Sequence, residues 1–209
     1  MDALALPDDR PVNLDAWRHY LRARLYRFLK QPEPAIVELR AALRHDPDFV
    51  RAAHLLAYLL GAQGRFDQVL PLLERSVSLR PRDAGAWYNL GYARDRGNDP
   101  ARAIDAFREA VRLSPRLDQA WYGLGRCHAA LDQLDDAVKA FEEAARLQPM
   151  KGFAWYELGL VHHRRHDAEQ VRYIAEHLNR FDRHTARRLI HDTGRTDLSH
   201  LVSDLRSLN

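Results

Sequence analysis

The strongest constraint on how this chain can fold is a short motif that returns at a constant interval. The hexapeptide Ala86–Gly91 (Ala-Trp-Tyr-Asn-Leu-Gly) recurs with one substitution at 120–125 and again at 154–159, so both steps have the same length, which we call the repeat interval. Recurrence at one fixed period indicates tandem copies of a single structural unit. Other residues follow the repeat interval: Pro47, Pro81, Pro115 and Pro149, and the set Ala103, Phe107 and Ala110 with Ala137, Phe141 and Ala144.

The spacing inside each copy predicts two helices. Trp87, Leu90 and Gly91 are separated by three or four residues, so they share one face of a helix, and Ala103 and Phe107 share a face of the next. The small residues allow the two helices to approach closely, with the Phe107 ring filling the space beside them. Because one such pair cannot bury its apolar faces alone, the copies are expected to stack on one another.

The connections between helices repeat as well. Gly64, Asn98 and Asp132 are separated by the repeat interval and fall between the two helices of a copy. These residue types tolerate the left-handed conformation that commonly ends a helix. The recurring prolines then interrupt the chain before each new unit.

This combination of a tryptophan, Leu-Gly, an Ala/Phe/Ala helix and a proline resembles the tetratricopeptide repeat (TPR) family, whose units are about 34 residues long. The resemblance implies an all-α fold, a TPR-type α-solenoid whose helix-turn-helix repeats form a right-handed superhelix, with the first helices lining a concave groove. Residues 84–151 match the pattern best. The resemblance covers five units, 16–49, 50–83, 84–117, 118–151 and 152–185.

The segments outside the repeats carry separate expectations. Residues 1–15 are expected to be a mobile lead-in, and residues 186–209 to form C-terminal capping helices. Thr196 is a suitable N-cap for the last of these helices. Its apolar stripe caps the last repeat or, alternatively, docks on a partner protein or, through Leu198, Leu201 and Leu205, on a second copy. The stripe consists of Leu198, Leu201, Val202, Leu205 and Leu208.

A second stripe of side chains predicts a binding surface. The residue after each tryptophan position and the residue four further on share a helix face, and in the TPR family this face lines the groove. Tyrosine and arginine combine apolar area with directed hydrogen bonds, so the stripe favours an extended or helical peptide of another protein that carries acidic and aromatic residues. The candidate residues are Arg24, Arg51, His54, Tyr58, Tyr88, Tyr92, Arg96, Gln119, Tyr122, Arg126, Tyr156 and His163.

Two considerations limit this interpretation. The tyrosines could serve only to support neighbouring repeats, and the arginines could simply be solvated. The family members that clamp the free carboxylate of chaperone tails have Lys directly after the first tryptophan position and Asn four residues later. No pair here matches, which disfavours that ligand and leaves open a variant that binds the carboxylate through arginine. The pairs are Tyr20/Arg24, His54/Tyr58, Tyr88/Tyr92, Tyr122/Arg126 and Tyr156/Leu160.

We expect no enzymatic activity, no cofactor and no metal. His162 and His166 are four residues apart, a spacing that can bind zinc on a helix, but no His-Glu-x-x-His motif is present and His162 falls at a packing position. Cys127, the single cysteine, falls where the family places small packing residues, so it is predicted to be buried and inert. The sequence contains no phosphate-binding loop, nucleophile elbow or dinucleotide fingerprint.

Charge and composition bound the remaining possibilities. A single cysteine, no signal-like opening and no apolar run of about 20 residues predict a cytoplasmic protein without a membrane span. The formal net charge of +3 does not require a nucleic acid partner. The stretch 177–195 has five arginines against two aspartates, so a docking patch for nucleic acid or an anionic surface stays open as an alternative to a solvated face.

Overall fold

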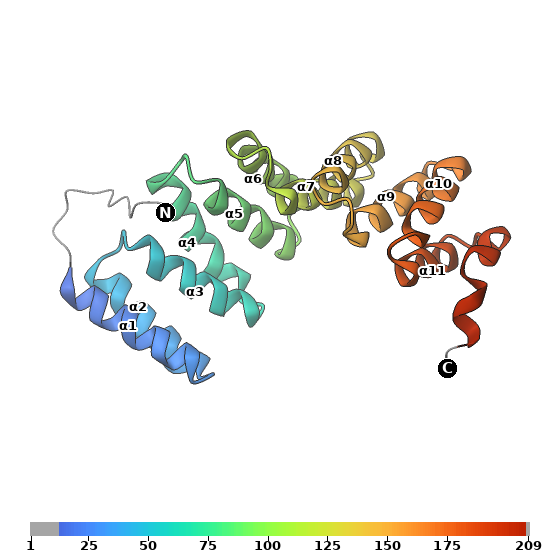
Figure 1. The fold of residues 1–209 in the computed structure, drawn as a ribbon. Coiled ribbons are helices and arrows are strands. Elements are labelled where there is room, and N and C mark those ends of the chain that lie inside the picture. The colour runs from blue at the N-terminus through green and yellow to red at the C-terminus, as the bar shows by residue number, and fades with distance from the viewer. Residues whose placement is uncertain (1–12, 208–209) are drawn as a thin grey trace. The chain divides into compact units, whose positions relative to one another are not determined.

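The computed structural model describes residues 13–207, except the side chains of 204–207; residues 1–12 and 208–209 lie outside the description. Every regular element in the described part is a helix (Figure 1). None of these helices is long and apolar enough to cross a lipid bilayer. The chain divides into two units, Met1–Arg80 and Pro81–Asn209, which are described separately below.

Unit 1 consists of two helix pairs. The first pair is α1 (Leu14–Phe28) and α2 (Pro32–His45), and the second is α3 (Val50–Ala62) and α4 (Phe66–Leu79). The helices of each pair pack on each other, and α3 also packs on α2. The unit therefore buries one continuous row of apolar side chains, which includes Ala23, Leu39, Ala42, Leu56, Leu60 and Leu73.

Unit 2 continues the same arrangement and adds a C-terminal segment. Each second helix, α6 or α8, packs both on its own partner and on the first helix that follows. The helices α5, α7, α9 and α11 also contact one another in sequence, so they form one side of the unit. The elements are α5 (Ala84–Arg96), α6 (Pro100–Leu113), α7 (Asp118–Ala130), α8 (Leu134–Leu147), α9 (Gly152–Arg164), α10 (Ala168–Asn179), α11 (Arg183–Asp192) and the 3₁₀ segment η1 (Thr196–Ser207).

Glycines allow the close packing between these helices. The buried Phe107 ring of α6 lies against Gly91 of α5 and Gly123 of α7. A Cβ atom built at Gly91 would lie 2.7 Å from the ring, and one built at Gly123 would lie 2.5 Å from it. Phe141 of α8 lies against Gly125 in the same manner. One aromatic ring thus joins its own helix pair to the next, at a distance that a side chain larger than hydrogen would prevent.

The structure also explains why tryptophan and proline recur together. In the three copies of the hexapeptide, the indole nitrogen of the tryptophan donates a hydrogen bond to the carbonyl oxygen of the proline six residues before it, at 3.0, 3.0 and 2.9 Å for Trp87, Trp121 and Trp155. Each bond fixes the loop that enters a first helix. Ala53 holds the tryptophan position in α3, and a cavity of about 350 Å³ there is lined by residues that include Ala53 and Pro47.

The turns inside the helix pairs are left-handed in every repeat, always at the same position of the unit. Positive φ angles of 57° to 73° occur at Lys30, Gly64, Asn98, Asp132 and His166. Lys30 and His166 were not among the turn residues expected from their type. Because lysine and histidine have no strong preference for this conformation, the packing of the flanking helices must impose it.

The two flanking segments differ in detail from the expectations. The helix α1 begins at Leu14, inside the expected 1–15 lead-in, because the side chain of Asn13 accepts a hydrogen bond from the Ala16 amide at 3.0 Å. At the other end, α11 already begins at Arg183, and η1 is a 3₁₀ segment with a break at Val202 rather than an α-helix.

Leu198 supports the capping interpretation of η1. This side chain is 1% exposed and lies in one apolar cluster with Leu178 of α10 and Leu189 of α11. A residue buried in its own chain is not free to dock on a second copy. Leu201 packs against the same cluster, while the side chains of Leu205 and Leu208 lie outside the described residues.

We predict that Gly123→Ala lowers the free energy of unfolding by about 1–2 kcal/mol, because overpacking against Phe107 outweighs the higher helix propensity of alanine. Urea denaturation measures the change. Gly61→Ala is the matched control, since its Cβ would meet nothing closer than 3.8 Å and should not destabilise. In a Phe107→Leu background the loss should shrink; fully additive losses would contradict the packing argument.

Candidate functional site

Tyrosine–carboxylate pairs connect neighbouring first helices of unit 2. The hydroxyl of Tyr122 on α7 donates to Glu157 Oε1 on α9 at 3.4 Å, and the hydroxyl of Tyr156 on α9 donates to Asp192 Oδ2 on α11 at 2.6 Å. In each pair the acid follows the tyrosine by 35 or 36 residues, which is about one repeat. We call the surface of α5, α7 and α9 that carries Tyr88, Tyr122, Glu157 and their neighbours the first-helix face.

An ion pair makes the corresponding connection between α5 and α7. Arg126 Nη2 lies 3.3 Å from Asp95 Oδ2, and the Asp95 side chain is only 11% exposed. The guanidinium is therefore occupied by a largely buried carboxylate of the same protein. A ligand would have to compete for this arginine or share it.

Burial affects the charge of the carboxylate that Tyr122 contacts. Burial raises the pKa of Glu157, while Arg126, the hydrogen bond from Tyr122 and Arg188 lower it in part. The net direction is upward. The first-helix face therefore combines a half-buried acid with arginines on both sides, and its charges are mostly balanced internally.

Tyr88 breaks the pattern of paired tyrosines. The acid that pairs with Tyr122 or Tyr156 lies about one repeat further along the chain than the tyrosine. For Tyr88 the corresponding position is Gly123, so Tyr88 has no such acid. Among the described residues, the Tyr88 hydroxyl has no hydrogen-bond partner within reach. Burial raises the pKa of Tyr88, and the nearby Tyr92 and Asp118 raise it further. The phenol thus stays protonated at neutral pH and can donate to a ligand.

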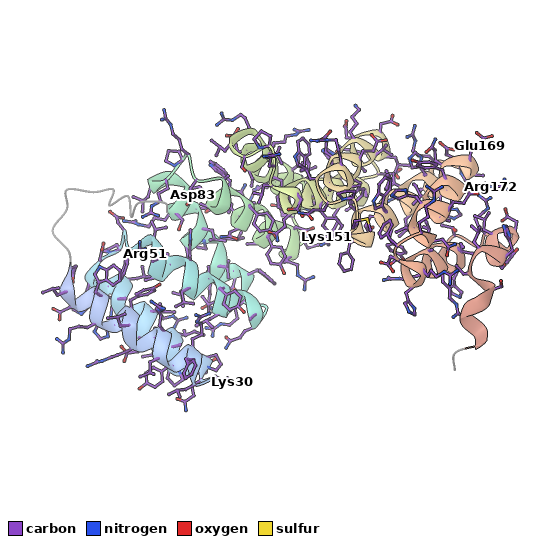
Figure 2. All side chains as sticks on the ribbon, in the orientation of Figure 1. Lys30, Arg51, Asp83, Lys151, Glu169 and Arg172 are labelled. Atoms are coloured by element: carbon purple, nitrogen blue, oxygen red, sulfur yellow. The ribbon has the colours of Figure 1, made fainter. Side chains whose placement is uncertain are left out.

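A cavity of about 310 Å³ opens beside Tyr88. It lies between α5, α7, the end of α8 and the start of α9, where Lys151 marks its position in Figure 2. Lys151 Nζ lies 3.5 Å from Asp118 Oδ2, so the charges of these two lining residues balance each other. Phe153, another lining residue, is 73% exposed. The lining residues are Tyr88, Asp118, Gln119, Tyr122, Ala144, Gln148, Lys151, Phe153 and Ala154.

The cavity brings together three residues of the expected stripe, Tyr88, Gln119 and Tyr122. Tyr92 lies next to them, with its ring centroid 6.5 Å from that of Tyr88, and is 47% exposed. Arg96, the last residue of α5, is exposed, and no ion pair to another described residue is present at its side chain. These side chains are accessible to a ligand.

Tyr156 and His163 lie elsewhere. Tyr156 is 8% exposed because α11 packs over it, and the Arg188 guanidinium lies 4.5 Å from the centre of its ring. It therefore supports the packing of α9 and α11, contrary to the expectation that it lines an open groove. His163 is exposed near the end of α9 and does not line the cavity.

Four residues of the expected stripe belong to unit 1. Arg24 on α1 is exposed, and the Arg51 guanidinium lies 5.6 Å from the centre of the Trp17 ring. His54 is half-buried, and Tyr58 is 66% exposed. These side chains do not line the cavity of unit 2.

The histidines and the cysteine take packing or turn positions. Within residues 13–203, no group of three or more His, Cys, Asp and Glu side chains is arranged to hold a metal ion. His162 is buried, with Nδ1 3.4 Å from Asp167 Oδ2, and burial lowers its pKa. His166 lies in the left-handed turn after α9. Cys127 is fully buried, and burial, reinforced by Asp95, raises its pKa to about 12.

Internal contacts use part of the basic stretch 177–195. Arg195 donates to the Ala168 carbonyl oxygen at 2.6 Å and pairs with Asp197 at 2.7 Å. Arg188 lies 3.4 Å from Asp192. The exposed remainder, Arg180, Arg183 and Arg187, is a smaller patch than the sequence indicated.

The sequence stripe did not identify Asp118 and Lys151 as part of the site, nor the tyrosine–carboxylate pairs. The offset of 35 or 36 residues from tyrosine to acid was a usable signal for the pairs. The Lys151–Asp118 pair also spans about one repeat, 33 residues, and joins the N-cap of α9 to the first turn of α7.

We predict that Cys127 in the native protein does not react with iodoacetamide at pH 8, because the thiol is buried and its pKa of about 12 leaves almost no thiolate. The protein denatured in urea should be alkylated completely. Mass spectrometry measures both. Rapid alkylation of the folded chain would contradict the assignment of Cys127 as a packing residue.

Comparisons with known proteins agree with this architecture. No curated protein sequence matches the chain. The fold is similar to a crystal structure of MamA protein (TM-score 0.75, 22% identity, 90% of this chain and 98% of that one). It is also similar to YrrB, described as a TPR protein with an unusual peptide-binding site (0.74, 19%, 86% and 92%), and to PilW, a type IV pilus biogenesis factor (0.73, 18%, 94% and 94%).

Three family models, each described as tetratricopeptide repeat, match residues 18–49, 54–118 and 96–158. Together they span most of the helix pairs described above, including α5, α7 and the start of α9, which form the first-helix face. The chain is a member of the tetratricopeptide repeat family.

Proposed function

We propose that the protein is a non-catalytic interaction scaffold that holds an extended segment of a partner protein on the first-helix face of unit 2. The observation that carries this proposal is the cavity of about 310 Å³ next to Tyr88, whose hydroxyl has no partner among the described residues. Membership of the TPR family supports a protein-binding role. The similarity to YrrB agrees with it, although the peptide-binding site named there belongs to YrrB.

The cavity suits one apolar or aromatic anchor side chain of the partner. Tyr88 and Tyr122 supply its aromatic wall, and Ala144 and Ala154 leave the space open. Binding an anchor in a partly enclosed pocket removes apolar area from water on both sides, which is how interface hot spots gain most of their energy. The exposed Phe153 would cover the anchor, and the Tyr88 hydroxyl would donate to a carbonyl oxygen of the bound segment.

Ion pairs within the protein reduce the number of basic side chains that could attract an acidic segment. Arg126 is paired with Asp95 and Lys151 with Asp118, so neither is a free cation. Arg96, which follows Tyr88 and Tyr92 at intervals of four residues on α5, has no such pair among the described residues and is available to attract a carboxylate. We therefore propose an aromatic or aliphatic anchor followed by an acidic residue near Arg96, rather than a generally acidic ligand.

To test this proposal, peptides would be selected from a random phage-displayed library on the full chain, and their affinity measured by fluorescence anisotropy. Gln119→Trp places a large side chain at the cavity, so it should weaken binding at least about tenfold. Gln170→Trp is the matched control, since Gln170 is also an exposed glutamine in the first turn of a helix, on α10. Equal binding to wild type and to both variants would refute the site.

A further inference from the structure

The helix α1 has apolar side chains on two opposite faces. One face, with Ala16 and Ala23, is fully buried in unit 1. On the other side Leu21 and Leu25 are 54% and 56% exposed, and Phe28 is 81% exposed. Spacings of four and three residues place these three side chains in one row, and Leu14, seven residues before Leu21 and 73% exposed, extends it. We call this surface the outer face of α1; it comprises Leu14, Arg18, Leu21, Arg22, Leu25 and Phe28.

The repeat register shows what this face corresponds to. The helices α3, α7 and α9 each pack against the second helix of the preceding pair, which is α2, α6 or α8. Among the described residues, Leu25 has no such cover. Its equivalents in the later repeats are all buried to 7% exposure or less: Leu59, Ala93, Cys127 and Val161. The part of the outer face around Leu25 therefore corresponds to a surface that the later first helices bury. Phe28 extends this part at a position that stays exposed in the later repeats (Ala62, Arg96, Ala130 and Arg164).

Two arginines set the chemistry of that helix. Arg22 stands where the other four repeats bury a leucine (Leu56, Leu90, Leu124 and Leu158), and Arg18 stands where they bury an alanine (Ala52, Ala86, Ala120 and Ala154). From Leu14 to Lys30 the chain carries four arginines and a lysine against the single acid Asp15, which pairs with Arg18 at 3.2 Å. A covering helix must supply carboxylates to these arginines or leave them desolvated and short of negative charge.

We propose that the outer face of α1 docks an acidic amphipathic helix of a partner protein. Its apolar row packs on Leu21, Leu25 and Phe28, and its Glu or Asp side chains pair with Arg18 and Arg22. It takes the place that α2, α6 and α8 hold on the later first helices. The proposal concerns unit 1 alone and does not depend on the cavity of unit 2.

Other occupants fit the face less well. A second copy packed through the same face would set arginine against arginine, which disfavours a symmetric dimer. An anionic membrane would suit a basic amphipathic helix, but it does not account for the burial of the positions equivalent to Arg18, Arg22 and Leu25 in the later repeats. Both occupants are outcomes of the test below.

The probe is a fluorescent 18-residue helical peptide with leucines at helical spacing and glutamates on both sides of them; its control replaces every glutamate with lysine. Fluorescence anisotropy with the full chain at 50 mM salt should show at least about tenfold tighter binding of the glutamate peptide. Arg18→Glu/Arg22→Glu should reverse the preference. Leu25→Ser should weaken binding about tenfold, while folding, checked by circular dichroism, is unchanged because Leu25 is already 56% exposed.

Matched controls lie in unit 2. Arg108→Glu changes an exposed arginine of α6, and Met150→Ser changes a 70% exposed apolar residue of the α8–α9 loop. Neither should alter binding of the glutamate peptide, and Gln119→Trp should not alter it either. Failure of the cavity test and failure of this test are therefore distinguishable.

Four results would overturn the proposal. The first is equal binding of the glutamate and lysine peptides, or none of either. The second is a dimer, detected by light scattering, that Leu25→Ser converts to monomer. The third is sedimentation with phosphatidylserine-containing vesicles, lost in Leu25→Ser, without peptide binding. The fourth is peptide binding that appears only after residues 1–12 are removed, which would assign the face to that segment.

Discussion

The packing of one phenylalanine ring on two glycines determines the geometry of unit 2. Phe107 of α6 lies against Gly91 of its own pair and Gly123 of the next, at distances where even a methyl group would collide. Apolar burial provides the stabilising free energy, but the glycines determine how closely the helices approach. This close approach brings α5, α7, α9 and α11 within reach of polar contacts between neighbouring first helices.

The same constraint accounts for the location of the cavity. Position 123 cannot both accept the Phe107 ring and carry a carboxylate for Tyr88, so it is a glycine and Tyr88 stays unpaired. One repeat later the equivalent position is Glu157, which accepts the hydrogen bond from Tyr122. The candidate site thus lies where a packing requirement overrides a polar contact that the next two repeats retain.

The repeat explains which parts of the structure the sequence could predict. Helix pairs, turns and buried residues follow from the constant repeat interval, because every copy faces the same neighbours. Tyr88, Gln119 and Tyr122 could be placed on one surface for the same reason. The expectation that Tyr156 lines an open groove was wrong. Residues of α11, which follows the five repeats, cover its side chain.

Other features were beyond prediction because they depend on more than residue type. The repeat interval marks 30 and 166 as turn positions, but lysine and histidine do not by type favour the positive φ angles found there, which the flanking helices impose. The hydrogen bonds from tryptophan to proline explain a recurrence that the sequence showed without its cause.

The first and last described helices differ in whether their outer apolar side chains are covered. On the C-terminal side, Leu198 folds back onto α10 and α11, so the last apolar face is covered from within the chain. On α1, arginines replace the alanine and the leucine that later repeats bury. Contact with water alone would explain these arginines. However, the apolar side chains of Leu21, Leu25 and Phe28 are exposed beside them. A face that needed only solvation would not keep a continuous apolar row. An apolar row flanked by an excess of cations is suited to bind an amphipathic helix that carries negative charges.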